Sequence, residues 1–195
     1  MPKLTRIFWR RTFRFASIVF VAAGLTLGGY LGYLQWSGNF HTVVEGQLYR
    51  SAQPSASQIA DYVQRYGIKT IINLRGRNDQ ADWYNTEIAM AKQVGIRHVD
   101  FRMSARRIVT RERADNLIEI MKNAPKPILI HCQAGADRSG IVAAIYSKAI
   151  AGVAKETAEK QLSIFFGHVG IPYLSSTFAM DQSWEMLENE LKTDG

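Results

Sequence analysis

The 195-residue chain has a single cysteine, Cys132, and no two of its four histidines lie close together in the sequence. One cysteine excludes an internal disulfide framework, so its chemistry or its packing must explain its presence. One cysteine and four dispersed histidines also give no paired spacing of the kind that binds zinc. We therefore expect neither a metal nor another cofactor.

Acidic residues are missing from the first fourteen positions, which carry five of the 24 Lys and Arg residues. The remaining 19 basic residues are nearly balanced by 17 acidic ones, so the formal net charge of +7 comes mostly from this tail. Proteins that bind nucleic acid usually cluster their basic residues on one face of a domain. We therefore expect no nucleic-acid partner.

Segment 15–36 contains no charged residue over 22 positions, close to the ~20 needed to cross a bilayer as a helix. We predict a transmembrane helix there, after a basic cytoplasmic tail at 1–14 and before a linker at 37–42. No Lys or Arg follows until Arg50, so the positive-inside rule places the N-terminus in the cytoplasm and the following domain on the periplasmic or outer side. A cleaved secretory signal and a buried core helix are the alternatives.

Three glycines, Gly24, Gly28 and Gly32, recur at four-residue spacing within this segment. Small residues on one helix face allow two membrane helices to approach closely. We therefore hypothesise a homodimer through this face. The alternative is that glycine is simply frequent in membrane helices.

Residues 43–195 alternate short apolar runs with helical segments, a pattern long enough for one catalytic domain. This order predicts an α/β fold with a central, mostly parallel sheet flanked by helices. A hairpin over 42–49 comes first. The other predicted strands are 68–74, 96–101 and 127–130, and the predicted helices are 57–66, 83–94, 110–123, 139–152, 155–164 and 176–191. We expect Gly67 to end the first of these helices and Thr110 to cap the third.

The stretch His131–Gly140, HCQAGADRSG, lies between the last predicted strand and a helix. Such a loop can turn its backbone N–H groups toward one point, where the helix N-terminus adds partial positive charge. A nearby cation and a helix N-terminus favour the thiolate form of a cysteine. Arg138 can hold two phosphoryl oxygens with its planar fork, and Ser139 is placed to donate a hydrogen bond to the thiolate. These residue types indicate nucleophilic attack on phosphorus.

The sequence His131-Cys132, five residues, then Arg138-Ser139 resembles the phosphate loop of the cysteine-dependent protein tyrosine and dual-specificity phosphatases. The segments 48–54 (LYRSAQP) and 72–75 (INLR) resemble parts of small bacterial and fungal dual-specificity-like members. The resemblance implies a dual-specificity phosphatase-like fold. It also implies that Cys132 forms a phosphocysteine intermediate and that His131 supports the loop. The phosphate-binding residues would be Gln133, Ala134, Gly135, Ala136, Asp137 and Arg138.

The family also uses an aspartate general acid about thirty residues before the cysteine. Asp100 lies 32 positions before Cys132 and is our first choice. No Trp-Pro-Asp tripeptide is present, and the sequence around Asp100 resembles that of phospholipid-directed members more than that of phosphotyrosine enzymes. Asp137 is the rival, since some lipid-directed relatives carry an aspartate at that position. Asp115, in a predicted helix, is third.

An arginine cluster follows Asp100, opposed only by Glu112; its members are Arg102, Arg106, Arg107, Arg111 and Arg113. A solvated loop is the usual explanation of such a run. Its position beside the proposed acid instead favours binding of a further phosphate or an anionic headgroup, with Arg75 and Arg77 as possible contributors. Trp83 and Tyr84 are expected to pack in the core or at the rim of the site.

The expected activity is metal-independent hydrolysis of a phosphomonoester in a phosphoprotein, at Tyr, Ser or Thr, or in another phosphoester. A phospholipid headgroup, such as phosphatidylglycerophosphate or a phosphoinositide, is the alternative substrate. A sulfurtransferase, an arsenate reductase and a non-catalytic phosphate-binding module are the rival hypotheses. The sequence leaves the physiological substrate and the oligomeric state open.

Overall fold

The computed structural model describes residues 2–191, except for the side chains of residues 2–8, 10 and 11. The side chains of Lys3, Arg6, Arg10 and Arg11 in the predicted basic tail therefore lie outside the described part, as do residues 192–195. The chain divides into two compact units, one ending at Trp36 and the other beginning at Ser37.

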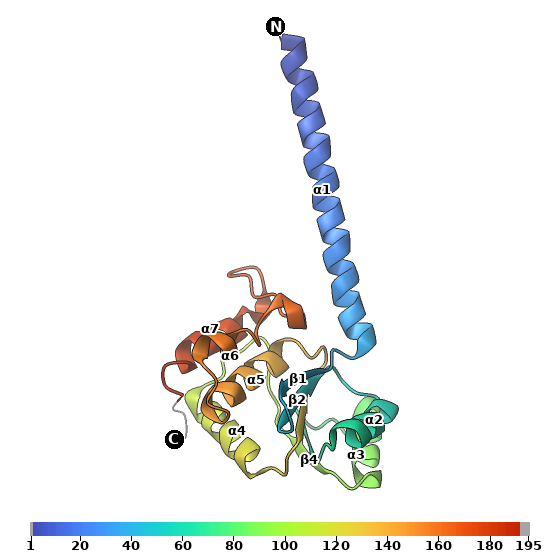
Figure 1. The fold of residues 1–195 in the computed structure, drawn as a ribbon, viewed down its shortest axis with the longest axis vertical. Helices are drawn as coiled ribbons and strands as arrows, with labels where there is room; N and C mark the ends of the chain where they lie inside the picture. Colours follow the sequence, from blue (N-terminus) through green and yellow to red (C-terminus); the bar gives the residue numbers. More distant parts are fainter. Residues whose placement is uncertain (1, 192–195) are drawn as a thin grey trace. The chain divides into compact units, whose positions relative to one another are not determined.

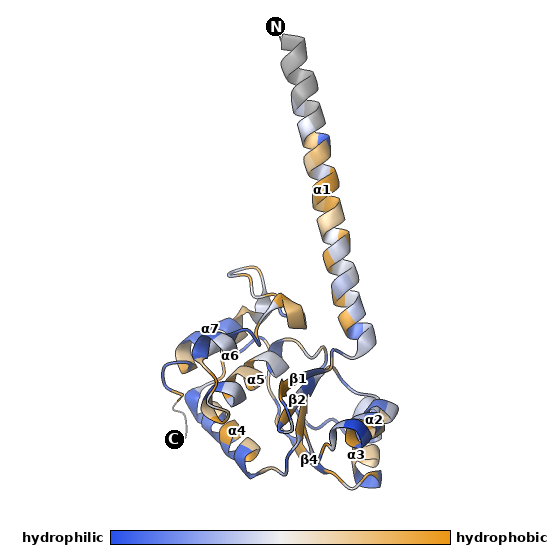
Figure 2. Ribbon diagram, in the orientation of Figure 1, coloured by the Kyte–Doolittle hydropathy of each residue, from blue (hydrophilic) through white to orange (hydrophobic). Residues whose placement is uncertain are grey.

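The first unit is one long helix, α1 (Pro2–Ser37). Its span Thr12–Ser37 has a mean hydropathy of 1.7, and the most apolar window of that span has no buried residues; Figure 2 shows the apolar colour along the middle of the helix. It is long and apolar enough to cross a membrane. A Cβ added at Gly24, Gly28 or Gly32 would meet no described atom within 4 Å, so this face is free of neighbours within the described residues. The homodimer remains a prediction.

The second unit is built on a five-stranded sheet in the order β1-β2-β5-β3-β4. β1 (His41–Val44) and β2 (Leu48–Ser51) form the antiparallel hairpin expected from the sequence, although β1 begins inside the predicted linker. The other three strands, β3 (Thr70–Asn73), β4 (Arg97–Asp100) and β5 (Ile128–His131), continue the sheet parallel to β2. The sheet is therefore mixed but mostly parallel, with β5 at its centre.

Helices cover both faces of the sheet (Figure 1). One face carries α2 (Ala56–Tyr66) and α3 (Asp82–Gln93), and the other carries α4 (Arg111–Asn123), α5 (Asp137–Ala149), α6 (Lys155–Glu159) and α7 (Ala179–Leu187). Successive strand residues point to opposite faces. In β5, Ile128 and Ile130 pack in the core beneath α4 and α5, whereas Leu129 packs in the core beneath α2. The predicted α/β class is confirmed.

Capping residues explain where two of the helices begin and end. The Ser55 side chain accepts a hydrogen bond from the backbone N–H of Gln58, and the Gln58 side-chain oxygen accepts one from the backbone N–H of Ser55, forming a capping box. Gly67 ends α2 with a positive φ of 65°, a conformation that glycine adopts without steric cost. The Thr110 side chain caps α4 as expected.

Two predicted helices differ from the observed ones. The helix expected over 155–164 ends at Glu159, and a short 3-10 helix, η1 (Ile164–Phe166), follows. The physical reason is that the N–H groups of Gln161 and Leu162 donate to carbonyls three residues earlier instead of four, so the chain continues in tight turns. The buried Arg50 guanidinium also donates to the Gln161 carbonyl, 2.8 Å away. The helix expected over 176–191 begins as a 3-10 turn, η2 (Ser176–Phe178), and its α-helical part ends at Leu187.

Candidate active site

The loop that carries Cys132 lies at the carboxyl end of β5, where the parallel strands of an α/β sheet commonly bind ligands. Cys132 is only 2% exposed, and α5 begins five residues later at Asp137. Gly135 has a φ of +71°, and a Cβ there would lie 2.6 Å from the Ala52 nitrogen. Both the conformation and the packing therefore require glycine at this position.

A buried arginine that the sequence analysis did not single out holds this loop. Arg50, in β2, is fully buried and donates from Nη2 to the carbonyls of Gly135 and Ala136, at 2.8 and 2.9 Å. Its guanidinium also lies over the Phe166 ring, 4.3 Å from the centroid. Burial lowers the pKa of Arg50 to about 9, while the nearby Cys132 and Asp137 act in the opposite direction. A charged residue directly after the apolar pair Leu48-Tyr49 was the available signal.

The carbonyls of Gly135 and Ala136 are bound to Arg50, and the backbone N–H groups of the loop remain available to bind a ligand. Among residues 2–191, the backbone N–H groups of Gln133, Gly135 and Ala136 donate to no other described group. Two buried side-chain atoms in the same place, Arg138 Nε and Ser139 Oγ, also have no hydrogen-bond partner among the described residues. Buried donors normally have partners. This concentration of free donors around Cys132 fits a tetrahedral oxyanion such as a phosphoryl group.

A second buried charged residue, Glu87 of α3, holds His131 in place. Its Nε2 lies 3.0 Å from Glu87 Oε1, and His98 Nε2 lies 2.6 Å from the same oxygen. The other carboxylate oxygen of Glu87 accepts from Gln53. Burial alone would raise the pKa of Glu87, but the hydrogen bonds from His131 and His98 lower it to about 2. Glu87 is therefore an ionised anchor that fixes the residue preceding Cys132.

The structure places Asp100 at the end of β4, with both carboxylate oxygens engaged. Asn73 donates to Oδ1 at 2.8 Å, and the Tyr84 hydroxyl donates to Oδ2 at 2.6 Å. Burial and this hydrogen bond raise the pKa of Tyr84 to about 12, so the hydroxyl keeps its proton. Asp100 does not line the cavity described below. Its role as the general acid stays a prediction that requires release of one of these oxygens.

The rival acid, Asp137, occupies the first turn of α5. Its Oδ1 lies 2.7 Å from Nδ1 of the buried His168, whose Nε2 lies 2.9 Å from Asp181 Oδ2. The third candidate, Asp115, is exposed on α4 and pairs with Arg111. The structure therefore pairs Asp137, five residues after Cys132 in the sequence, with His168, and neither Asp137 nor Asp115 lines the cavity.

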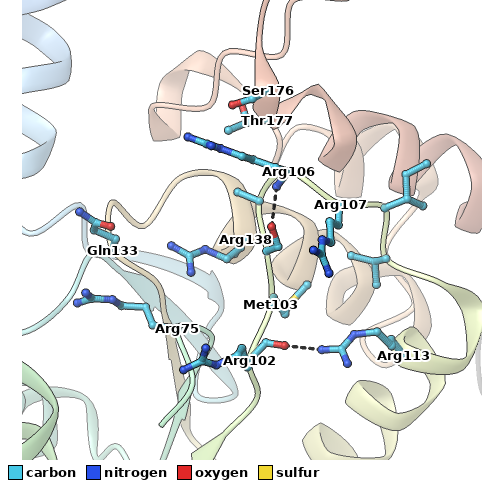
Figure 3. A pocket seen from close by; sticks show the side chains of 14 residues that line it. Arg75, Arg102, Met103, Arg106, Arg107, Arg113, Gln133, Arg138, Ser176 and Thr177 are labelled. Atoms are coloured by element: carbon cyan, nitrogen blue, oxygen red, sulfur yellow. Dashed lines mark hydrogen bonds between the residues drawn. The ribbon is translucent and has the colours of Figure 1, made fainter. Parts of the chain in front are cut away.

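A cavity of about 730 Å³ opens beside the loop. Six arginines line it and no carboxylate of residues 2–191 does; they are Arg75, Arg102, Arg106, Arg107, Arg113 and Arg138. Figure 3 shows their side chains around one space, together with Gln133, Ser176 and Thr177. The segment that follows β4 provides most of this wall. A space with this concentration of positive charge strongly favours an anionic ligand.

The predicted arginines divide into two groups. Arg111 donates to Asp115 and to Glu190, and Arg77 donates to Asp79, so neither lines the cavity. Arg75 donates to Gln53 Oε1 at 2.8 Å and lies over the Trp83 ring, 3.6 Å from its centroid. Burial and the neighbouring Arg138 lower the pKa of Arg75. Trp83 thus holds a cavity arginine, a contact that the sequence did not indicate.

No three His, Cys, Asp or Glu side chains in the described part of the chain are grouped so that they could hold a metal ion. The donors at this site instead belong to backbone amides and arginines. The arrangement can bind a phosphoryl group and present a buried sulfur to its phosphorus atom.

Comparison with known proteins places the chain among phosphatases. The chain is 30% identical over 116 residues to the dual specificity protein phosphatase TpbA of Pseudomonas aeruginosa, covering 59% of this chain and 49% of that protein. It therefore spans about half the length of that curated relative. The crystal structure of P. aeruginosa TpbA matches with a TM-score of 0.58 and 25% identity, over 80% of this chain and 91% of that one. The catalytic core of the PP-IP phosphatase SIW14 from S. cerevisiae shares the fold, with a TM-score of 0.57 and 23% identity over 78% and 91%.

A family model provides the assignment. The model described as the tyrosine phosphatase family matches residues 27–161, which include β1 to β5, the Cys132 loop and α5. This match covers more than half of the chain, and its region contains Cys132, Arg138 and the buried side chains of Arg50 and Glu87. The chain belongs to the tyrosine phosphatase family.

Proposed function

We propose that the protein is a metal-independent phosphomonoester hydrolase that acts through a cysteinyl-phosphate intermediate. The Cys132 thiolate attacks phosphorus, the bond from phosphorus to the ester oxygen breaks, and an acid protonates the departing oxygen. Water then attacks phosphorus, gives up a proton to a base, and displaces the thiolate, releasing inorganic phosphate. The observation that supports this is the set of free buried donors around Cys132.

Each neighbouring residue has a defined part in this cycle. Arg138 binds two equatorial oxygens of the phosphoryl group as a planar fork. Ser139 Oγ, buried and without another partner among the described residues, donates to the thiolate and stabilises it as a leaving group in the second step. Because phosphoryl transfer depends mainly on positioning and charge stabilisation, Arg50 and Glu87 contribute by fixing the loop. Asp100 is the proposed acid and Asp137 its rival.

The six-arginine cavity leads us to propose a substrate with further anionic groups. The loop and Arg138 are sufficient to bind a lone phosphoryl group. The charges of the other arginines in the wall remain for further anions: Arg106 and Arg107, together with Arg102 and Arg113, which donate to backbone carbonyls and have no described carboxylate partner. A multiply charged headgroup, such as phosphatidylglycerophosphate or a phosphoinositide, supplies such charges. The apolar span of α1 is also consistent with hydrolysis of a phosphate ester on a membrane lipid.

Phosphoprotein is the second candidate substrate. P. aeruginosa TpbA is described as a dual specificity protein phosphatase, and one of its crystal structures is a complex with pTyr. A phosphopeptide with acidic residues beside the phosphorylated side chain would also suit the cavity. The two candidates differ in whether the second anion is a phosphate or a carboxylate.

A release assay on the full chain in detergent distinguishes these substrates. We expect faster release of inorganic phosphate from phosphoinositides or phosphatidylglycerophosphate than from phosphotyrosine peptides. Arg107→Gln should raise KM for the multiply charged substrate about tenfold, the effect of losing one charge-assisted hydrogen bond, and leave p-nitrophenyl phosphate unaffected. Arg111→Gln is the matched control, since Arg111 is paired outside the cavity. A preference for phosphotyrosine peptides, with Arg107→Gln silent, would favour the phosphoprotein substrate.

We also propose that α1 anchors the protein with its N-terminus in the cytoplasm and the second unit on the periplasmic or outer side. The sequence asymmetry of Lys and Arg supports this orientation. Reporter fusions at the C-terminus test it, because a reporter active only outside the cytoplasm should be active in this fusion. Activity of a cytoplasm-specific reporter instead would reverse the orientation.

A further inference from the structure

A buried histidine between two carboxylates connects the catalytic loop to the C-terminal segment. His168 is 3% exposed and follows η1. Its Nδ1 lies 2.7 Å from Asp137 Oδ1, and its Nε2 lies 2.9 Å from Asp181 Oδ2. Asp137 begins α5, next to Arg138, whereas Asp181 belongs to α7. One ring therefore ties the two helices together.

The segment from His168 to Asp181 forms a wall of the cavity. Residues 168–181 include η2, whose Ser176 and Thr177 line the space beside the six arginines. The tip of the same segment is exposed, with Tyr173 at 105% and Leu174 at 83%. No buried apolar anchor therefore holds the tip. The hydrogen bonds of the His168 ring with Asp137 and Asp181 connect this wall to the start of α5, beside the catalytic loop.

Gly170 shows that the position of Asp181 is specific. A Cβ at Gly170 would collide with the Asp181 carboxylate, so a side chain here displaces Asp181 from His168. The charged groups that face His168 are Asp137 from α5 and Asp181 from α7, and Arg50 from β2 acts on Asp137. The neutral ring can donate from one nitrogen only, whereas the protonated ring donates to both carboxylates.

We propose that His168 is a positioning residue: its imidazolium, held between Asp137 and Asp181, clamps the Ser176–Thr177 wall of the cavity to the start of α5. The clamp is closed while the ring is protonated and opens when the proton is lost. It rests on the proposed function, because the wall matters for a substrate that fills the cavity. A small phosphoester that occupies only the Cys132 loop does not need it.

The sign of the pH dependence follows from the surroundings of the ring. Burial lowers the pKa of His168, but the hydrogen bonds with Asp137 and Asp181 outweigh it and raise the pKa above the ordinary 6.5. A raised histidine pKa means that the contribution is complete below pH 6.5 and is lost as pH rises through the pKa of the folded protein. The cavity wall should therefore loosen on the alkaline side.

Kinetics of the full chain in detergent test the clamp. In the wild type, KM for a short-chain phosphatidylinositol phosphate should rise about tenfold as pH increases through the His168 pKa, because one charge-assisted hydrogen bond is lost, whereas the pH profile of kcat should be the same in the wild type and in His168→Asn. KM for p-nitrophenyl phosphate should show no such step. His168→Asn should remove the step, and Asp181→Asn should move it to lower pH. Asp61→Asn, an exposed position on α2, is the matched control and should leave it unchanged. A wild-type step that persists in His168→Asn overturns the proposal.

A readout independent of turnover keeps this test separate from the proposed function. NMR titration of the His168 ring should give a pKa above 6.5 in the wild type and a lower one in Asp181→Asn and Gly170→Ala. Cleavage by chymotrypsin after the exposed Tyr173 should become faster in the wild type above that pKa. If no phosphoester is hydrolysed but both results hold, the proposed function fails and the clamp stands. An unperturbed His168 titration with pH-independent cleavage overturns the clamp whatever the activity.

Discussion

Glu87→Gln should weaken both the fold and the site, because this carboxylate is the ionised partner of His131 and His98. The pKa of Glu87 is lowered from 4.5 to about 2. At 1.36 kcal/mol per pH unit, this difference corresponds to about 3 kcal/mol of stability at neutral pH. Glutamine keeps the shape but not the charge, so we expect the free energy of unfolding to fall by about that amount. kcat/KM should also fall as His131 loses its fixed position before Cys132.

Urea unfolding of the full chain in detergent, followed by tryptophan fluorescence, measures this change. A lowered carboxyl pKa stabilises above pH 4.5, and the contribution is lost as pH falls toward 2. The wild type should therefore lose stability over this acidic range more steeply than Glu87→Gln. Glu119→Gln, an exposed position on α4, is the control and should change little. A loss below 1 kcal/mol at pH 7 for Glu87→Gln, equal to the control, would refute the reasoning.

Three further predictions concern the loop, the acid and the membrane helix. Arg50→Lys removes the fork that holds the Gly135 and Ala136 carbonyls and should lower kcat/KM about 100-fold with circular dichroism retained; activity near that of wild type would contradict the bracing role. Asp100→Asn should slow esters with poor leaving groups far more than p-nitrophenyl phosphate, and equal slowing of both would favour Asp137. Gly28→Ile should reduce self-association in membranes, and unaltered association would count against the dimer face.

The fold was largely predictable because its signals are local. Apolar runs bounded by Gly and Pro marked the strands, and Thr110 and Gly67 marked helix ends that the structure confirms. The helix expected over 155–164 was wrong beyond Glu159, because the chain there forms tight turns whose N–H groups donate three residues back, and Arg50, 111 residues away, binds the Gln161 carbonyl. Local propensity cannot anticipate such a contact.

The candidate site was predictable where its residues are contiguous in the sequence. The Cys132 loop is one motif, and Arg75 and the arginines after β4 were recognised by composition, although Arg111 and Arg77 proved to be paired elsewhere. The supporting residues were missed because their partners are distant in sequence: Glu87 lies 44 residues from His131, and His168 lies 31 from Asp137. A buried charge looks like a surface charge until the chain folds.

The central claim is that Cys132 carries the phosphoryl group during turnover. Rapid acid quenching of the full chain with a phosphorus-labelled substrate, followed by mass spectrometry of its peptides, measures this directly. We predict label on the peptide that contains Cys132, and no turnover by Cys132→Ser, which should still bind the phosphoester. Unchanged turnover by Cys132→Ser, or label on any other residue, would contradict the account.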